Sequence, residues 1–117
     1  MEVPGVVDAP RVVNVRKAEL VKRGYRDFED WASRPGHVYV GRNMNFYVRG
    51  AHGSKWANPF SAKKYGLDEC LALYANHIRA RHEEIRLDLC GAVELGCWCA
   101  PNKCHADLLR AVIKTCE

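Results

Sequence analysis

The sequence has no long hydrophobic run, and we expect no leader segment. No apolar stretch approaches the roughly 20 residues that span a bilayer. The first eight residues carry an early acid, Glu2, and no basic segment followed by an apolar one. We therefore expect no membrane partner and a cytoplasmic or other intracellular location. In that reducing environment the six cysteines would be free thiols, metal ligands or catalysts and not disulfides.

Several familiar ligand signatures are also missing. The chain contains no G-x4-G-K-[ST] phosphate loop, no G-x-G-x2-G dinucleotide motif, and no paired C-x2-C of the kind found in zinc ribbons and fingers. It has no internal repeat and no low-complexity segment. The formal net charge of +4 is compatible with an anionic ligand or with nucleic acid, but it is too small to require either.

What is present fits one α/β domain over residues 11–117, after an irregular lead-in over residues 1–10. A chain of 117 residues is long enough to bury one core. Short β-branched or alternating segments predict three strands, at 11–16, 37–42 and 92–99. In the last of these, the alternation places Val93, Leu95, Cys97 and Cys99 on one face and Glu94, Gly96 and Trp98 on the other.

Helices are expected between and after these strands. Residues 17–34 are charged with apolar residues at roughly helical spacing, which predicts a helical or partly irregular excursion. Apolar spacing from Leu67 to Leu89 predicts one amphipathic helix over about 68–87, with Cys70 in the core and a solvated outer face of mixed charge. A final helix over 106–113 would have Asn102 as its N-cap. The fold class is therefore a small α/β domain with three or more strands in a partly parallel sheet, Rossmann-like in the loose sense.

A cluster of three thiols and one imidazole lies at the predicted junction between the last strand and the last helix. Its members are Cys97, Cys99, Cys104 and His105. These four side chains have the softness that zinc prefers. Adjacent residues such as Cys104 and His105 cannot easily turn to the same ion, so a complete zinc site would borrow a remote histidine such as His37 or His52.

Two other interpretations of the cluster remain open. Cys104 or Cys99 could be a catalytic nucleophile, because Lys103, His105 and a helix N-terminus would all favour the thiolate of Cys104. Alternatively, Cys97 and Cys99 could simply fill the core, since cysteine is among the most buried residue types.

A second cluster of functional groups lies in the loop after the second strand. Gly53 would expose its backbone N–H, Ser54 and Asn58 would donate hydrogen bonds, and Lys55 together with Arg42 would supply positive charge. These groups could cradle a phosphate or a carboxylate. The alternative is a tight turn that Trp56 anchors to the core, although Trp56 could also stack on a base.

The carboxyl ends of the second and third strands should meet at one edge of the sheet, where open α/β folds bind ligands. We therefore expect one pocket between Arg42, the 54–58 loop and the 97–105 turn. It would bind an anionic small molecule, a nucleotide or a nucleotide-derived group, with thiol or metal-assisted chemistry of the transferase or hydrolase type. The alternative is a non-catalytic module, stabilised by zinc, that binds nucleic acid or a protein partner.

Three segments of this sequence resemble a known family. They are residues 39–42 (YVGR), residues 53–60 (GSKWANPF), and residues 95–101 with residues 104–109 (LGCWCAP and CHADLL). In this order they are similar to domain of unknown function family 4326, and the likeness extends from about residue 11 to about residue 113. The resemblance implies one domain with one site, in a bacterial, phage or large DNA virus protein, and it implies no particular reaction. Residues 17–34 and 43–50 are longer than the usual spacing of the family.

Overall fold

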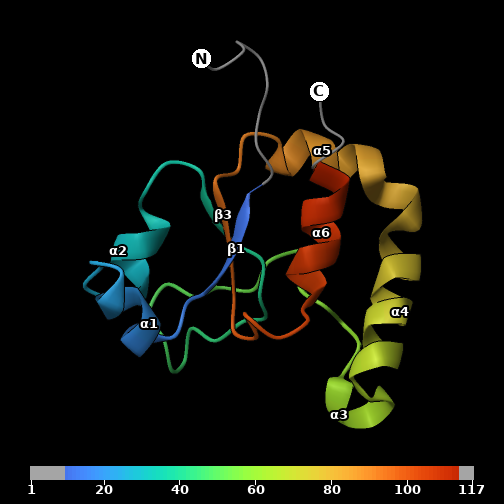
Figure 1. Cartoon of the computed structure of the whole chain (residues 1–117), viewed down its shortest axis with the longest axis horizontal. Helices are drawn as coiled ribbons and strands as arrows, with labels where there is room; N and C mark the ends of the chain where they lie inside the picture. Colours follow the sequence, from blue (N-terminus) through green and yellow to red (C-terminus); the bar gives the residue numbers. More distant parts are fainter. Residues whose placement is uncertain (1–9, 114–117) are drawn as a thin grey trace.

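A three-stranded parallel sheet lies at the centre of the molecule, with helices on both of its faces (Figure 1). The computed structural model describes residues 10–113, so the predicted lead-in, apart from Pro10, and the sixth cysteine, Cys116, lie outside the described residues. The strands are β1 (Arg11–Asn14), β2 (His37–Tyr39) and β3 (Glu94–Cys97), in the order β1-β3-β2. The predicted α/β class and the parallel sheet are confirmed.

Each strand is shorter than the sequence predicts because the chain turns away soon after the ladder ends. One hydrogen bond continues each pairing: Val15 donates to the carbonyl of Cys97, and Val40 donates to the carbonyl of Gly96. Beyond Cys97 the chain enters a tight turn in which the N–H of Asn102 donates to the carbonyl of Cys99. The predicted third strand over 92–99 is therefore wrong at both ends.

The central strand β3 is buried on both faces. Leu95 and Cys97 pack into a core formed with α4, α5 and α6, whereas Glu94 and Gly96 face the helices on the other side of the sheet. The predicted alternation therefore holds within the paired strand. It fails at its flanks: the side chain of Val93 is 53% exposed and Cys99 is exposed, because neither residue lies in the ladder.

Two short helices cover one face of the sheet. They are α1 (Lys17–Lys22) and α2 (Phe28–Ala32), and they account for the excursion predicted over 17–34. The carboxylate of Asp27 caps α2 by accepting the N–H of Asp30. Leu20, Phe28 and Trp31 pack beneath them in a second core that also contains Val13 of β1.

The helix predicted over 68–87 is wrong as a single element. A short helix α3 (Ala62–Tyr65) leads into α4 (Leu67–Ile78), and a 3₁₀ turn η1 (Arg79–Arg81) then redirects the chain into α5 (His82–Leu89). In Figure 1, α5 crosses the end of α4 at the top of the molecule. Ile78 and Ile85 lie on either side of this bend and are buried in the same core. The spacing of apolar residues therefore stays helical across the bend, and it does not indicate that the chain changes direction.

The predicted N-cap of the last helix is also wrong. The helix α6 (His105–Ile113) begins three residues after Asn102. Instead, the carboxylate of Asp107 accepts the N–H of Cys104, and the N–H of Asp107 donates to the carbonyl of Cys104. His105 is therefore the first residue of α6, and Cys104 lies directly before it.

Cys70 is buried as predicted, whereas Cys90 is exposed.

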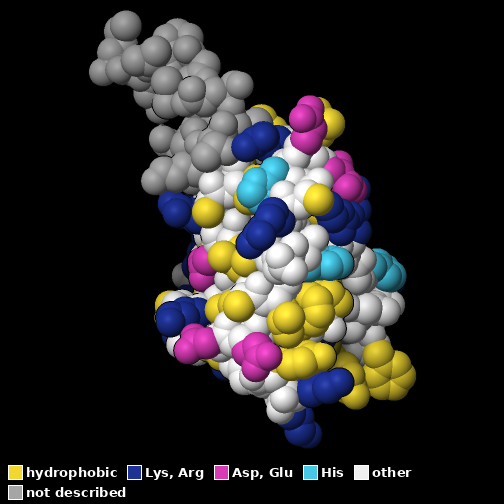
Figure 2. All heavy atoms as spheres, turned by 90° about the vertical axis from the view of Figure 1, so that its right-hand side faces the viewer, with side chains coloured by type: hydrophobic (Ala, Val, Ile, Leu, Met, Phe, Trp, Pro, Cys, Tyr) yellow, Lys and Arg dark blue, Asp and Glu magenta, His cyan; other side chains and the backbone are white. Residues whose placement is uncertain are grey.

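The surface has charges of both signs (Figure 2). Figure 2 shows Lys and Arg side chains next to Asp and Glu side chains over the end of the molecule that carries α5, with hydrophobic side chains gathered lower on the same face. Among the described residues there is no helix with the length and hydrophobicity to cross a bilayer.

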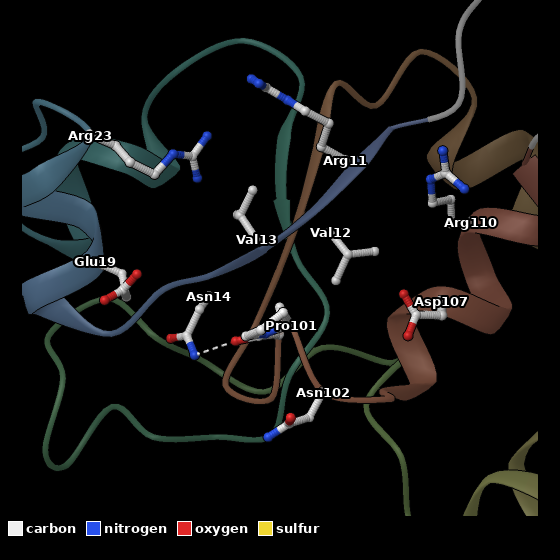
Figure 3. Close-up of a pocket in the computed structure, with 11 residues that line it drawn as sticks. Arg11, Val12, Val13, Asn14, Glu19, Arg23, Pro101, Asn102, Asp107 and Arg110 are labelled. Carbon is white, nitrogen blue, oxygen red and sulfur yellow. Dashed lines mark hydrogen bonds between the residues drawn. The ribbon is translucent and has the colours of Figure 1, made fainter.

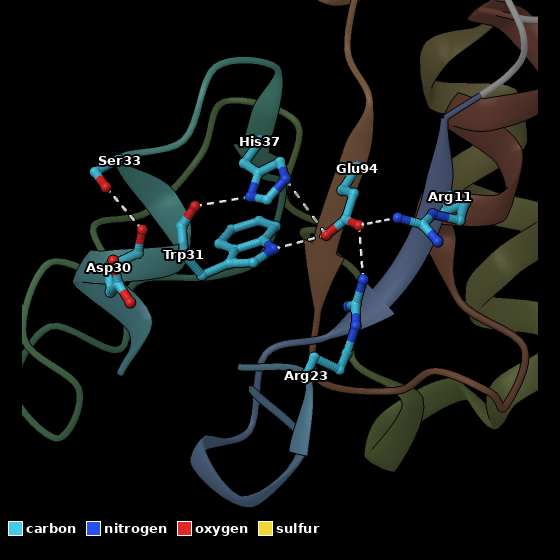
Figure 4. A network of polar contacts seen from close by, with 7 residues as sticks. All are labelled: Arg11, Arg23, Asp30, Trp31, Ser33, His37 and Glu94. Carbon is cyan, nitrogen blue, oxygen red and sulfur yellow. Dashed lines mark hydrogen bonds and ion pairs between the residues drawn. The ribbon is translucent and has the colours of Figure 1, made fainter. Parts of the chain in front are cut away.

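A buried carboxylate ties β3 to both of its neighbouring strands (Figure 4). Glu94 is only 1% exposed; it accepts ion-paired hydrogen bonds from Arg11 and Arg23 and a hydrogen bond of 2.9 Å from the indole Nε1 of Trp31. The Nε2 atom of His37 lies 3.7 Å from the same carboxylate. Burial raises the pKa of Glu94, but the donors Trp31 and Arg23 and the nearby positive charges outweigh it, so the pKa is lowered.

Candidate functional site

A cavity of about 420 Å³ lies at the carboxyl ends of β2 and β3. Its walls come from the turn after β2, the loop that leads into α3, the start of α4, and the segment between β3 and α6. The lining residues are Gly41, Arg42, Asn58, Pro59, Phe60, Ser61, Ala62, Lys63, Leu67, Cys70, Leu71, Cys97, Trp98, Cys99, Lys103, Cys104 and His105. Folding therefore brings Arg42 and the whole cysteine cluster to one cavity, which we call the strand-end pocket.

The structure places most of the predicted 53–58 loop outside this pocket. Lys55 turns away to α5, where its amine forms ion pairs with Asp88 and, at 3.0 Å, with Glu84. These two carboxylates raise the pKa of Lys55, and the hydrogen bond that its amine donates to Asp88 contributes most. The prediction that Lys55 lines the pocket is wrong, because acidic partners 29 and 33 residues later in the sequence hold its charge elsewhere.

The remaining loop residues form a local turn. The hydroxyl of Ser54 accepts the N–H of Trp56, and the N–H of Ser54 donates to the carbonyl of Gly41. Trp56 is 3% exposed and lies under the guanidinium of Arg81, 4.6 Å from its ring centroid, so it anchors the loop and is not open to a base. Gly53, Ser54 and Trp56 do not line the strand-end pocket, which corrects their assignment as its residues, and only Asn58 of this loop does.

The strand-end pocket is lined by three cations and by no carboxylate among the described residues. The cations are Arg42, Lys63 and Lys103, and Lys103 also lies 3.6 Å from the exposed Asp68. Lys63 is a pocket residue that the sequence did not predict. No signal in the sequence identifies it, because the short helix α3 that carries it has no clear apolar period. The three charges give the pocket a positive potential that attracts anions.

At the floor of the pocket, the sulfur of Cys97 accepts several hydrogen bonds. Its donors are the thiol of Cys104 and the backbone N–H groups of Cys99 and Ala100, which the turn after β3 directs back to the end of the strand. The hydrogen bond from Cys104 contributes most, and together these donors lower the pKa of Cys97 to about 7 although burial opposes ionisation. Of the two buried thiols Cys97 and Cys104, Cys97 is thus the one that ionises first.

Cys104 lies between Cys97 and a histidine whose tautomer is fixed. The Nε2 atom of His105 is 2.6 Å from the carbonyl of Val40, which can only accept, so Nε2 carries a proton and donates. Nδ1 of the neutral ring is therefore an acceptor, 3.5 Å from the sulfur of Cys104. Donation to Cys97 and burial raise the pKa of Cys104, and burial lowers the pKa of His105. Cys104 is therefore the donor of this pair of thiols, and its hydrogen bond stabilises the thiolate of Cys97.

The proposed zinc ligands do not form a metal site as they stand. Over residues 10–113, no three His, Cys, Asp or Glu side chains are grouped closely enough to hold an ion. Nε2 of His105 is committed to Val40, and Cys99 is exposed. Of the two histidines that the sequence offers as remote ligands, His37 faces Glu94 at the other end of the sheet, and His52 does not line the pocket. The donor set of Cys97, Cys99, Cys104 and His105 therefore does not fit zinc in this arrangement.

We expect Cys104→Ala to raise the pKa of Cys97 and Cys104→Ser to leave it low. The reason is that serine keeps an O–H donor to the Cys97 sulfur, whereas alanine removes the largest of the stabilising hydrogen bonds. The measurement is the rate of alkylation of the Cys97 peptide as a function of pH, followed by mass spectrometry. Equal profiles for the two variants would show that the Cys104 thiol has no influence on Cys97.

Comparison with known protein families identifies the family of this chain. A protein-family model described as Domain of unknown function (DUF4326) matches residues 24–115 of this chain. The matched range contains every residue that lines the strand-end pocket. No curated protein and no solved structure matches the chain.

Proposed function

Because this chain belongs to the DUF4326 family, a domain of unknown function, we propose its function from its own geometry: the strand-end pocket binds an anionic small molecule, a nucleotide or a nucleotide-derived group. The observation that carries the proposal is the lining of the cavity, which contains the cations Arg42, Lys63 and Lys103 and, among the described residues, no carboxylate. Its position at the carboxyl ends of parallel strands supports the same conclusion, since ligands bind there in open α/β sheets.

The chemistry of the walls favours recognition of phosphate over recognition of a base. Each polar atom of the Asn58 amide already has one partner within the chain: Nδ2 donates to the sulfur of Cys70, and Oδ1 accepts the N–H of Phe60, so the orientation of this side chain is fixed by the fold. Apolar side chains of Pro59, Phe60, Leu67 and Leu71 form the opposite wall. A phosphate or diphosphate would pair with the cations, and the apolar wall would accept a ring by contact alone. We infer that the site discriminates by charge and shape more than by hydrogen bonds to the base.

The thiol chemistry of the site would act on this bound anion. The thiolate of Cys97 is the nucleophile in this proposal, and Cys104 and His105 are the residues that set its protonation. Attack by Cys97 on an electrophilic carbon or phosphorus of the ligand would expel a leaving group with its bonding electrons. Transfer of the captured group to an acceptor or to water makes the reaction that of a transferase or a hydrolase.

A binding experiment tests the proposal, and Arg42→Ala and Lys63→Ala are expected to weaken binding about ten- to a hundredfold because each removes a charge-assisted contact. The probes are ADP, inorganic pyrophosphate and adenosine, measured by thermal shift and calorimetry. A probe at a hundred times its dissociation constant stabilises the fold by about 2.7 kcal/mol.

The matched control is Lys64→Ala, which removes the same charge from the neighbouring position on α3 that does not line the pocket. ADP and pyrophosphate should bind and adenosine should not. Binding that Lys64→Ala weakens as much as Lys63→Ala would show that the anion is attracted by net charge alone. An absence of binding by ADP and pyrophosphate would overturn the proposal.

A further inference from the structure

A second, more open cavity of about 720 Å³ runs along the free edge of β1 (Figure 3). β1 is an outer strand of the sheet, because only β3 pairs with it. The groove lies between α1 on one face of the sheet and α6 on the other, and the turn at Pro101 and Asn102 forms its lower end. It lies apart from the strand-end pocket, and the proposed function does not use it.

The backbone of β1 presents hydrogen-bonding groups to this groove. The N–H groups of Arg11 and Val15 donate to Val93 and Cys97, so the odd-numbered residues of this strand face β3. In an extended strand successive residues face opposite sides, and the N–H and C=O groups of Val12 and Asn14 therefore point to the free edge. Such an edge is a template for another strand.

The charged side chains of the two flanking helices follow the same order along β1, with an arginine at one end and a carboxylate at the other. On α1 and just after it, Glu19 and Arg23 lie one turn apart; on α6, Asp107 and Arg110 do the same. In Figure 3 each arginine lies toward the Arg11 end of the groove and each carboxylate toward the other end. The groove thus has arginines at one end and carboxylates at the other on both faces of the sheet. One nitrogen of Arg23 is held by Glu94, and Nε of Arg110 donates to the carbonyl of Pro10, so both guanidinium groups are fixed at this end.

We propose that this groove is a twofold interface with a second copy of this chain, in which the two β1 strands pair antiparallel into one six-stranded sheet. A twofold axis perpendicular to the sheet turns the arginine end of one copy onto the carboxylate end of the other. Arg23 then faces Glu19 of the partner on one side of the sheet, and Arg110 faces Asp107 of the partner on the other. A partner of one charge sign would meet repulsion at one end of the groove, which favours a second copy.

The free edge also restricts the register to pairs of even-numbered residues, and the pairing centred on Val13 is one of these. With the axis at Val13, Val12 lies opposite Asn14 of the partner, and both residues of each pair have their N–H and C=O groups directed at the interface. That pairing forms two N–H to O=C bonds at each of two symmetric positions. A register shifted by one residue would place the odd-numbered residues of one copy opposite the even-numbered residues of the other. The backbone groups of the odd-numbered residues already bond to β3, so no hydrogen bonds could form between the two strands.

The test measures the mass of the whole chain by sedimentation over a range of concentrations, with the expected dimer at twice 13.3 kDa. Val12→Pro removes an N–H that faces the free edge and no bond to β3, so it should raise the dissociation constant about ten- to a hundredfold. Val12→Ala is the matched control, because it loses the side chain and keeps the N–H. Circular dichroism should show that both variants are folded.

A second pair of variants tests the charge order. Glu19→Lys would place a cation opposite Arg23 of the partner and weaken the dimer, whereas Glu83→Lys makes the same change on α5, outside the groove. A monomer at all concentrations overturns the proposal. So does a dimer that Val12→Pro weakens no more than Val12→Ala, or one that Glu19→Lys weakens no more than Glu83→Lys, since contact would then lie elsewhere.

Discussion

Replacing Glu94 with alanine is expected to lower the free energy of unfolding by about 3–5 kcal/mol, the usual result of removing one partner from a buried ion-paired network. The carboxylate accepts from Arg11, Arg23 and the indole of Trp31, and Trp31 is fully buried. Alanine would leave the Trp31 N–H without an acceptor where water does not reach it. Urea denaturation of the two proteins gives the difference.

Two other variants separate the contributions to this decrease in the free energy of unfolding. Glu94→Gln keeps an oxygen that can accept from Trp31 and gives up the charge, so it should lie between the wild type and alanine. Arg11→Ala should lower the free energy of unfolding by no more than about 1 kcal/mol, because the Arg11 side chain is 70% exposed and its ion pair is screened. If Arg11→Ala were as destabilising as Glu94→Ala, the stabilisation would come from the ion pair with Arg11 and not from the buried acceptor.

The contribution of Glu94 should also depend on pH in a defined direction. Its pKa is lowered in the folded state, so the folded protein binds this proton less readily than the unfolded chain, whose pKa is about 4.3. The stabilisation is fully present above that unfolded value and is lost as the pH falls through the lower folded pKa. The stability gap between wild type and Glu94→Gln should therefore be constant near neutral pH and shrink in acid. A gap that widened in acid would mean that the folded pKa is raised.

The sheet was predictable because its strands are short, β-branched or alternating, and separated by segments long enough for parallel connections. The position of β3 between β1 and β2 explains why even its charged residue, Glu94, is buried: both faces of this strand meet a core. Strand length and composition can be read directly from the sequence. The same strand pattern explains why the cysteine cluster and Arg42 could be expected near one another, since each follows the carboxyl end of a strand.

The features that the sequence did not predict depend on contacts between distant segments. The direction of Lys55 is set by Glu84 and Asp88 on α5, and α5 reaches that loop only because the chain bends at η1. The periodicity of apolar residues is the same on both sides of the bend, so it predicts one straight helix. In the cysteine cluster, composition ranked Cys104 and Cys99 as nucleophiles, whereas the donors to Cys97 come from a turn whose shape appears only after folding.

Gly96→Ala should lower the free energy of unfolding by about 1–3 kcal/mol, although strand propensity alone predicts a gain of about 0.5–1 kcal/mol. Gly96 is in the central strand, and a Cβ there would lie 2.5 Å from Cη2 of Trp31 and 2.6 Å from Cγ1 of Val15. The indole cannot move aside easily, because its Nε1 is bound to Glu94 two residues earlier on the same face of β3. The measurement is again urea denaturation.

A double-mutant cycle identifies the indole as the cause. Trp31→Phe removes the ring atoms nearest to the added methyl group, so Gly96→Ala should be much less destabilising in the Trp31→Phe background than in the wild type. The single variant Trp31→Phe also removes the donor to Glu94, which is why the comparison is made within each background and not between them. If Gly96→Ala had the same effect in the wild type and in the Trp31→Phe background, the close packing of α2 on the sheet would not depend on the absence of a Cβ at residue 96. The glycine would then be replaceable by any small residue that Val15 could accommodate.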